Sequence, residues 1–331
     1  MKILVTGASG FIGSHMVDQA LSMGYETWAA VRPTSNLSYL KGSDVQCVTL
    51  EFDDAALLEQ RLRAHRDSHG AWDVVIHCAG ATKCKHKDEF DRINYEGTRM
   101  LVDTLMRLDM IPNQFIFIST LGIYGPLHEQ EPHRSFVETD VPRPNTLYGK
   151  SKLKAEWYVR GVGALPYVIF RPTGVYGPRD KDYQILIRSI RSHIDLSLGL
   201  RPQQITFVYI KDLVQAVFLA IEKGVKHRSY LITDGNTYNS SDFTDAVRAA
   251  MGNPFTLHIP VPLWMGRIAA SIVDVCGRVL GHSFTFNSDK FRILAQRNWK
   301  CDISPLVDEL GYRPRYNLID GVAETLAEQD A

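Results

Sequence analysis

The chain has 331 residues, and its 37 Lys and Arg balance 37 Asp and Glu. The length predicts two lobes, or one domain with a large substrate lobe, and the balanced charge argues against whole-surface binding of nucleic acid or anionic lipid, so we expect a small-molecule partner. The five scattered cysteines include no Cys-x-x-Cys pair, which indicates neither a disulfide framework nor a metal site and fits a reducing compartment.

The first predicted elements are a buried strand over Lys2–Thr6 and a helix over Phe11–Met23, where apolar residues recur at helical spacing before Gly24. A strand that begins directly after the first Met leaves no room for the charged and apolar regions of a signal peptide. We therefore expect a cytoplasmic protein.

A glycine-rich segment lies between this strand and this helix, which is the context that a dinucleotide-binding fingerprint requires. Glycines at these places let the backbone approach a pyrophosphate, and the start of the helix offers free N–H groups and a favourable dipole. A mere tight turn is the alternative reading. The predicted phosphate-binding residues are Gly7, Ser9, Gly10, Phe11, Ile12 and Gly13.

A second strand is predicted over Thr27–Val31, and the residues after it bear on the choice of cofactor. NAD-binding chains place an acidic residue here for the ribose 2′-hydroxyl, but this chain continues Arg32-Pro33-Thr34-Ser35. Arg32 can lie against adenine and pair with a 2′-phosphate, with Ser35 as a further donor. NADP is therefore favoured, with NAD as the alternative if Arg32 is only a solvated charge.

Strands and helices then alternate, which predicts an α/β fold of the Rossmann type, a doubly wound parallel sheet covered on both faces. The further strands are expected at Val45–Phe52, Asp73–His77, Gln114–Ser119 and Tyr167–Arg171, and the helices at Ala55–Arg66, Asn94–Asp109 and Ser151–Val162. Later elements at Ile205–Ile210, Lys211–Glu222 and Ser229–Thr233 are expected to rejoin the first lobe. The predicted division is residues 1–171 plus 205–234 for the dinucleotide-binding domain, and 172–204 plus 235–331 for a smaller substrate-binding lobe.

The stretch Leu257–Gly281 is largely apolar, but Arg267, Asp274 and Arg278 interrupt it. A spanning helix needs roughly 20 mostly apolar residues, so we expect no membrane span here. A lobe helix that packs on its neighbours is the favoured reading, and a hydrophobic lid facing a lipid-like substrate is the alternative.

Two other features have competing readings. The run Lys83-Cys84-Lys85-His86-Lys87 could hold an anion or a metal, but a solvated loop beside the cofactor cleft is favoured, and no metal site is predicted. Trp157, Trp264 and Trp299 could stack on a substrate, although single tryptophans more often pack.

Several ordered motifs together resemble the extended short-chain dehydrogenase/reductase family, also called the NAD-dependent epimerase/dehydratase family. Beyond the glycine segment they are Asp73-Val74-Val75-Ile76-His77-Cys78-Ala79-Gly80, Asn94-Tyr95-Glu96-Gly97-Thr98, Phe117-Ile118-Ser119-Thr120, Tyr148-Gly149-Lys150-Ser151-Lys152 and Arg171-Pro172-Thr173-Gly174. The resemblance covers nearly the whole chain. It implies a homodimer formed through the helices around Asn94–Asp109 and Ser151–Val162.

The resemblance also assigns residues to the cofactor and its surroundings. Glu51 and Phe52 stand where the family meets adenine, although the family prefers Asp at the first of these positions. Asn94 would support the fourth helix. The backbone of Cys78, Ala79 and Gly80 would line the cofactor, and Pro172 and Thr173 would flank the nicotinamide.

Tyr148 and Lys152 are the predicted catalytic pair. A phenol titrates near 10, and an ammonium four residues away on the same helical face is expected to lower its pKa. By resemblance, Lys152 would also hold the nicotinamide ribose, and Thr120 would hydrogen-bond the reacting oxygen. Tyr148 would then move a proton while the cofactor moves a hydride at a hydroxyl or carbonyl carbon.

The neighbouring residues select among the family's reactions. Dehydratases follow the Thr with an Asp-Glu pair, whereas Leu121-Gly122 follow here, and sugar-nucleotide epimerases usually place an Arg where this chain has Ile205. The segment Pro260–Trp264 is similar to the branch of 3β-hydroxysteroid dehydrogenases and dihydroflavonol reductases, which implies an apolar ring substrate. The alternatives are an epimerase with tightly held NAD and a cofactor-sensing protein without catalysis.

Overall fold

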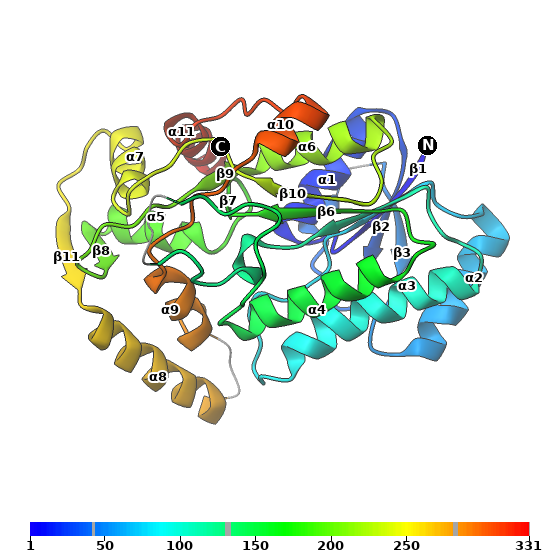
Figure 1. Cartoon of the computed structure of the whole chain (residues 1–331), viewed down its shortest axis with the longest axis horizontal. Helices are drawn as coiled ribbons and strands as arrows, with labels where there is room; N and C mark the ends of the chain where they lie inside the picture. Colours follow the sequence, from blue (N-terminus) through cyan, green and yellow to red (C-terminus); the bar gives the residue numbers. More distant parts are fainter. Residues whose placement is uncertain (42–43, 130–133, 281–283, 331) are drawn as a thin grey trace.

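A parallel sheet organises the fold of the computed structural model. Within the residues that the structure describes, 1–41, 44–129, 134–280 and 284–330, it has seven strands in the order β10-β6-β5-β4-β1-β2-β3 (Figure 1). These strands are β1 (Lys2–Thr6), β2 (Glu26–Val31), β3 (Gln46–Thr49), β4 (Val74–His77), β5 (Gln114–Ile118), β6 (Tyr167–Pro172) and β10 (Arg228–Ile232). The strand order reverses between β1 and β4, which is where α/β sheets of this kind bind ligands, at the carboxyl ends of the strands.

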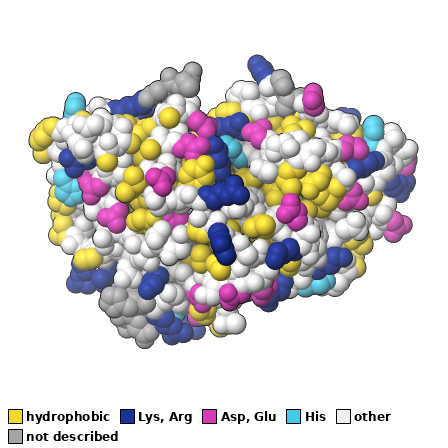
Figure 2. All heavy atoms as spheres, turned by 90° about the horizontal axis from the view of Figure 1, so that it is seen from above, with side chains coloured by type: hydrophobic (Ala, Val, Ile, Leu, Met, Phe, Trp, Pro, Cys, Tyr) yellow, Lys and Arg dark blue, Asp and Glu magenta, His cyan; other side chains and the backbone are white. Residues whose placement is uncertain are grey.

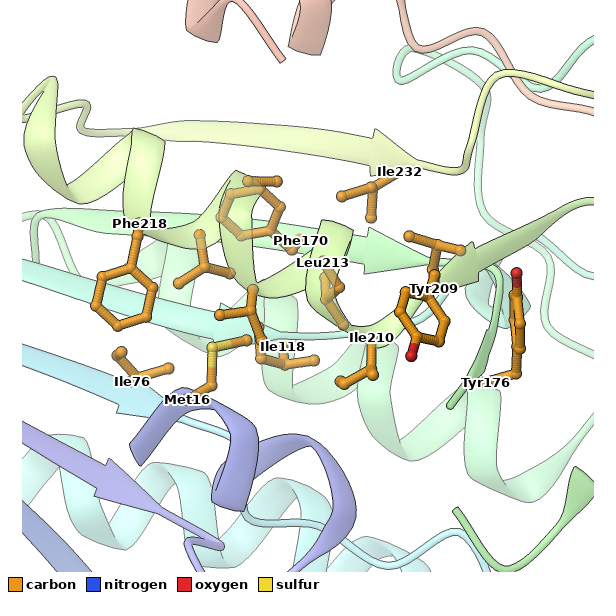
Figure 3. Packing of buried hydrophobic residues seen from close by; sticks show 14 of the residues in the cluster. Met16, Ile76, Ile118, Phe170, Tyr176, Tyr209, Ile210, Leu213, Phe218 and Ile232 are labelled. Atoms are coloured by element: carbon orange, nitrogen blue, oxygen red, sulfur yellow. The ribbon is translucent and has the colours of Figure 1, made fainter. Parts of the chain in front are cut away.

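Helices cover both faces of the sheet, as a doubly wound fold requires. One face carries α1 (Phe11–Ser22) and α6 (Ile210–Glu222), and the other carries α2 (Ala55–His69), α3 (Gly97–Arg107) and α4 (Leu147–Gly161). Figure 3 shows Met16 of α1 and Phe218 of α6 meeting Ile76, Ile118 and Phe170 of the sheet. Burying apolar side chains on both faces explains why the strands have nearly continuous apolar sequences. The predicted Rossmann-type fold is confirmed.

Most of the elements after β6, apart from α6, β10 and the last two helices, lie beyond the carboxyl ends of the strands (Figure 1). They are β7 (Gly174–Tyr176), α5 (Tyr183–Arg191), β8 (Ile194–Leu198), β9 (Phe207–Tyr209), α7 (Asp242–Ala250), β11 (Leu257–Val261), α8 (Leu263–Leu280) and α9 (Ser288–Ala295). Of the last two helices, α10 (Ser304–Leu310) packs against β10 and α6, and α11 (Leu318–Asp330) packs mainly against α7 and β9. The division into two domains stays a prediction.

Several predicted elements differ from the structure. The strand expected at Val45–Phe52 is only Gln46–Thr49, at the edge of the sheet. The strand expected at Ile205–Ile210 is only Phe207–Tyr209, and it pairs with β7 instead of joining the main sheet. Its shortening has a local cause, because the N–H of Ile205 donates to the carbonyl of Tyr238 at 2.7 Å.

Two helix starts also differ. A helix is expected to begin at Asn94, but Asn94 lies within a π-helical turn over Asp91–Glu96, and the regular helix α3 begins only at Gly97. The helix expected over Ser151–Val162 begins one turn earlier, at Leu147. This earlier start brings Tyr148 into the same helix as Lys152.

The apolar stretch Leu257–Gly281 forms the strand β11 and the helix α8. No helix in the described part of the chain is both long and apolar enough to cross a bilayer. On the side of α6, α10 and α11, basic and acidic side chains are interspersed (Figure 2). This view agrees with the balanced charge of the sequence.

Candidate active site

The glycine-rich turn between β1 and α1 is closely packed. Gly7 has a φ of +66°, which favours glycine, and a Cβ on it would lie 2.8 Å from the amide nitrogen of Ala79. A Cβ on Gly13 would lie only 2.2 Å from the carbonyl oxygen of Gly7. Side chains are therefore excluded from the inner surface of the turn.

The N-terminus of α1 has the features of an anion site. Its N-cap residue, Gly10, makes no side-chain capping bond, and the first turn contains no acidic residue. Helix-start N–H groups without side-chain caps are suited to a pyrophosphate. Ser9 lies in the turn itself, and Phe11 and Ile12 pack their side chains on the core. These residues fit the diphosphate of a dinucleotide.

Arg32 and Ser35 form a closed turn at the carboxyl end of β2. The hydroxyl of Ser35 accepts a hydrogen bond from the N–H of Arg32 at 2.9 Å, and the N–H of Ser35 donates to the carbonyl of Arg32 at 3.0 Å. The Arg32 side chain is exposed. Beyond the end of β3, Glu51 and Phe52 are partly buried, and Phe52 lies 6.1 Å from His77 between ring centroids. All four residues lie at the strand ends where the adenosine half is expected.

The end of β4 passes close to the glycine turn. The N–H of Cys78 donates to the carbonyl of Thr6, and the N–H of Ala79 donates to the Thr6 hydroxyl, both at 3.2 Å. A Cβ on Gly80 would lie 3.9 Å from Nζ of Lys152, so this backbone adjoins the predicted catalytic lysine. Burial raises the pKa of the Cys78 thiol to about 12, so it is not a reactive thiolate at neutral pH.

Asn94 joins the loop after β4 to α4. It is completely buried in the π-helical turn, and its amide accepts from the N–H of Ala81 at 2.7 Å and donates to the carbonyl of Ala81 at 3.0 Å. The same amide donates to the hydroxyl of Ser151 at 2.9 Å. π-turns are frequent at functional sites because they re-aim side chains. The contact with Ser151 agrees with the expected support of the fourth helix.

The start of α4 is fixed by side chains from two directions. The hydroxyl of Thr146 caps the helix by accepting from the N–H of Gly149 at 3.0 Å. The carboxylate of Asp289 on α9 accepts from the N–H groups of Leu147 at 2.7 Å and Tyr148 at 3.2 Å. The backbone of Tyr148 is therefore held by the lobe beyond the sheet.

The protonation of Tyr148 differs from the sequence-based expectation. Burial raises the pKa of its phenol to about 12, although a hydrogen bond with Thr120 acts in the opposite direction. The predicted acidification by Lys152 is therefore wrong for the chain alone. The reason is that desolvation penalises the phenolate more than the neighbouring groups of the chain stabilise it.

Lys152 is also buried, and burial lowers its pKa to about 8 while Glu156 and then Cys78 act to raise it. Its ammonium lies 4.0 Å from the centroid of the Phe117 ring, a cation–π distance. The lysine is thus mostly protonated at pH 7, but its pKa lies only slightly above that pH. Its charge depends on Glu156, one helical turn further along α4.

Two threonines lie at the ends of β5 and β6. The hydroxyl of Thr120 accepts from the N–H of Gly122 at 3.1 Å, and that of Thr173 donates to the carbonyl of Thr206 at 2.7 Å. Pro172 is the buried last residue of β6. The strand ends thus bring Thr120, Tyr148 and Lys152 together on the edge that also bears the glycine turn, and this arrangement suits proton transfer at a carbonyl or hydroxyl oxygen.

The lysine-rich loop after β4 and the three tryptophans are the remaining candidates for substrate or metal contacts. Lys83 pairs with Asp182 at 2.7 Å and donates to Thr285 at 2.9 Å, which ties the loop after β4 to the far lobe. Among the described residues no cluster of His, Cys, Asp and Glu could hold a metal. The packing reading holds for Trp299 but is wrong for Trp157 and Trp264, which are 61% and 65% exposed.

Sequence reasoning missed three supporting residues. Thr146 carried a readable signal, since a Thr three residues before a Gly at a helix start is a capping pattern. No local sequence signal marks Asp289, because it accepts a hydrogen bond from Tyr148, which is 141 residues away in the sequence. Glu156 is buried in an ion pair with Arg171, and no local pattern marks it.

Comparison with known proteins gives a consistent group of relatives. Residues 3–233 match the NAD dependent epimerase/dehydratase family. The chain is 27% identical to the dTDP-glucose 4,6-dehydratase of an Actinoplanes species, with 99% of this chain and 97% of that protein covered. It is 24% identical to the ceramide reductase of Caulobacter vibrioides, with 98% and 93% covered.

A solved structure of UDP-glucose 4-epimerase from Thermus thermophilus, in complex with NAD, superposes with a TM-score of 0.78 at 23% identity and covers 100% of this chain and 99% of that one. That likeness supports the fold. Proteins named for three different reactions thus resemble this chain to a similar degree. The choice among those reactions depends on the residues of the site.

Proposed function

The chain belongs to the NAD-dependent epimerase/dehydratase family, and from that premise we propose that it is an NADP-linked oxidoreductase that interconverts a ketone and a secondary alcohol on an apolar substrate. The observation that carries the proposal is the partly buried Tyr148 phenol, which interacts with Thr120 and lies one helical turn from Lys152. This set suits proton transfer to a single oxygen atom.

The protein's own groups would act on that oxygen. The nicotinamide, when bound, supplies or accepts the hydride. In reduction the Tyr148 O–H donates its proton to the carbonyl oxygen, while Thr120 hydrogen-bonds the same oxygen and Lys152 stabilises the phenolate that remains. A phenol whose pKa is raised to about 12 is protonated at neutral pH, so it can donate the proton that reduction of a carbonyl requires.

The residues next to Thr120 favour net oxidation or reduction over loss of water. Leu121 is 1% exposed, and the N–H of Gly122 is bonded to Thr120, so neither position offers an acid or a base. Dehydration needs such a pair in addition to the redox site. We therefore do not assign a dehydratase activity.

The substrate we propose is apolar, of the kind that a sterol or a ceramide represents. Ile205, at the place where sugar-nucleotide enzymes usually have Arg, packs on the core, and the lobe instead exposes Leu263 and Trp264. The ceramide reductase among the relatives supports this reading. A nucleotide-sugar epimerase with tightly held NAD is the alternative, supported by the T. thermophilus enzyme of the same fold.

Net turnover of added cofactor tests the proposal. The purified chain is mixed with NADPH and, in turn, a steroid ketone, a long-chain aliphatic ketone and UDP-glucose, and the absorbance of NADPH is followed. We expect NADPH to be consumed with an apolar ketone. Interconversion of UDP-glucose without net cofactor change would show the epimerase instead, and cofactor binding without any reaction would favour the sensing protein.

Arg32 should determine the preference for NADP. Because a charge-assisted hydrogen bond contributes about 1.5–3 kcal/mol, Arg32→Ala should weaken NADPH binding roughly tenfold to a hundredfold while NADH binding changes little. Titration calorimetry with both cofactors measures the two constants. Arg61→Ala, an exposed arginine on α2, is the matched control. Equal weakening for NADPH and NADH would contradict a 2′-phosphate contact.

A further inference from the structure

The helix α8 exposes an apolar face along its length. Its residues at helical spacing are exposed by 65% at Trp264, 53% at Ile268, 57% at Ile272, 50% at Val275 and 79% at Val279. In Figure 1, α8 lies at the periphery with α9 beside it. An exposed apolar row of this extent marks an interaction site more often than a chance surface.

The opposite side of α8 fixes this orientation. Gly266 and Ala270 are buried, and a Cβ on Gly266 would lie 3.2 Å from the ring of Phe291 on α9 and 2.5 Å from Leu198 on β8. Small residues thus let α8 approach its neighbours closely. The larger apolar side chains are left on the outer face.

The strands β8 and β11 extend the exposed area. Ile194 pairs with Leu257, and Leu196 pairs with Ile259, so these side chains share one face of a two-stranded parallel sheet. They are 40%, 55%, 55% and 39% exposed in that order. Leu198 lies on the same face and meets Gly266 of α8, so the strands and the helix are continuous. We call these four residues and the five of α8 the α8 surface.

The charged residues around the α8 surface are unequally exposed. Arg201 after β8 and Arg267 on α8 are both exposed. The acidic residues of β8 and α8, Asp195 and Asp274, both bond other parts of the chain. Asp195 is buried and accepts from Thr244 at 3.1 Å, and Asp274 accepts from the N–H of Ser288 at 3.3 Å. The outward charge beside the α8 surface is therefore positive, although the chain as a whole is neutral.

We propose that the α8 surface docks on an anionic lipid bilayer, with α8 lying in the plane of the interface and its apolar row in contact with the acyl chains. Apolar side chains on one face with basic residues beside them are typical of interfacial helices, and a tryptophan at one end suits the headgroup level. A second copy of the chain fits less well, because it would bring the same positive charges together.

Docking through α8 would also hold the active site near the bilayer. The neighbouring helix α9 bonds the backbone of Tyr148 through Asp289. The inference goes beyond the proposed function and does not depend on it, since the contacts that carry it lie outside the catalytic residues.

Vesicle flotation of the full chain tests the docking. We expect it to float with phosphatidylcholine vesicles containing phosphatidylglycerol, to float much less with phosphatidylcholine alone, and to lose binding as salt rises. The double substitution Ile268→Ser, Ile272→Ser should reduce the partition coefficient about tenfold or more, because it removes the centre of the apolar row. Arg267→Gln should reduce it about fivefold on anionic vesicles only.

Ile319→Ser on α11 is the matched control, since Ile319 is 63% exposed on another part of the molecule. It should bind vesicles like the unchanged chain, and all variants should keep the same thermal unfolding midpoint. Absence of flotation at physiological salt, or equal loss with Ile319→Ser, would overturn the proposal. So would a dimer in solution that the Ile268 and Ile272 substitutions dissociate while no vesicle binding is seen.

Discussion

Replacing Tyr148 with Phe is expected to lower the rate of ketone reduction by about two to four orders of magnitude, the usual contribution of a positioned general acid. The phenol is partly buried and interacts with Thr120, and its raised pKa keeps it protonated at neutral pH. Phe keeps the ring and its packing but has no proton to give, so cofactor binding should change little. Single-turnover reduction with a fixed NADPH load separates the chemical step from binding.

Tyr158→Phe is the control for this substitution. Tyr158 lies on the same helix, but its hydroxyl bonds Asp103 away from the site, so its loss should leave the rate of reduction unchanged. A Tyr148→Phe variant that kept most of its rate would remove the phenol from the mechanism. Cofactor binding without any reaction in either variant would instead support the sensing protein.

The pH dependence of the unchanged chain follows from Lys152. Its pKa is lowered to about 8, so the ammonium is present below that pH and is lost above it. Reduction supported by this charge should therefore be fast below about pH 8 and should fall as the pH rises further. The Tyr148 phenol does not impose a limit in this range, because its pKa is about 12.

The parts of the site that could be predicted from sequence are those encoded locally. Gly7 and Gly13 are glycines because the turn leaves no space for a Cβ. Their spacing between a strand and the start of a helix makes this turn recognisable in the sequence. Tyr148 and Lys152 share a helix face because they are four residues apart. The parallel sheet covered on both faces follows from the alternation of strands and helices along the chain.

The parts that could not be predicted depend on contacts between distant segments. Asp289 reaches Tyr148 only after α9 packs beside α4. The pKa of Tyr148 is set by burial, which the spacing of Tyr148 and Lys152 does not reveal. In the same way, the apolar run of α8 predicted a helix, but whether another element of the chain covers that helix is a property of the folded lobe.

Replacing Glu156 with Ala should destabilise the chain by about 3–5 kcal/mol, the usual cost of leaving one buried charge without its partner. The side chains of Glu156 and Arg171 are 1% and 4% exposed, and the guanidinium donates to the carboxylate at 2.7, 3.1 and 3.2 Å. Arg171 also donates to the hydroxyl of Tyr124 at 2.7 Å. This single neutral group cannot compensate the buried guanidinium for the loss of the Glu156 carboxylate. Urea unfolding at pH 7 measures the difference.

Two controls separate the buried pair from an ordinary ion pair. Glu59→Ala removes the partner of Arg63 at 2.7 Å and of Arg107 at 3.3 Å on the surface of α2 and α3, and it should change stability by less than about 1 kcal/mol. The double substitution Glu156→Leu, Arg171→Met replaces both charges with apolar side chains and should recover most of the stability that Glu156→Ala loses. Its activity should still fall at pH 7 to 8, because Glu156 raises the pKa of Lys152 and its removal leaves fewer lysines charged. If stability and activity recovered together in the double variant, Glu156 would have a structural role only, and the charge of Lys152 would not depend on it.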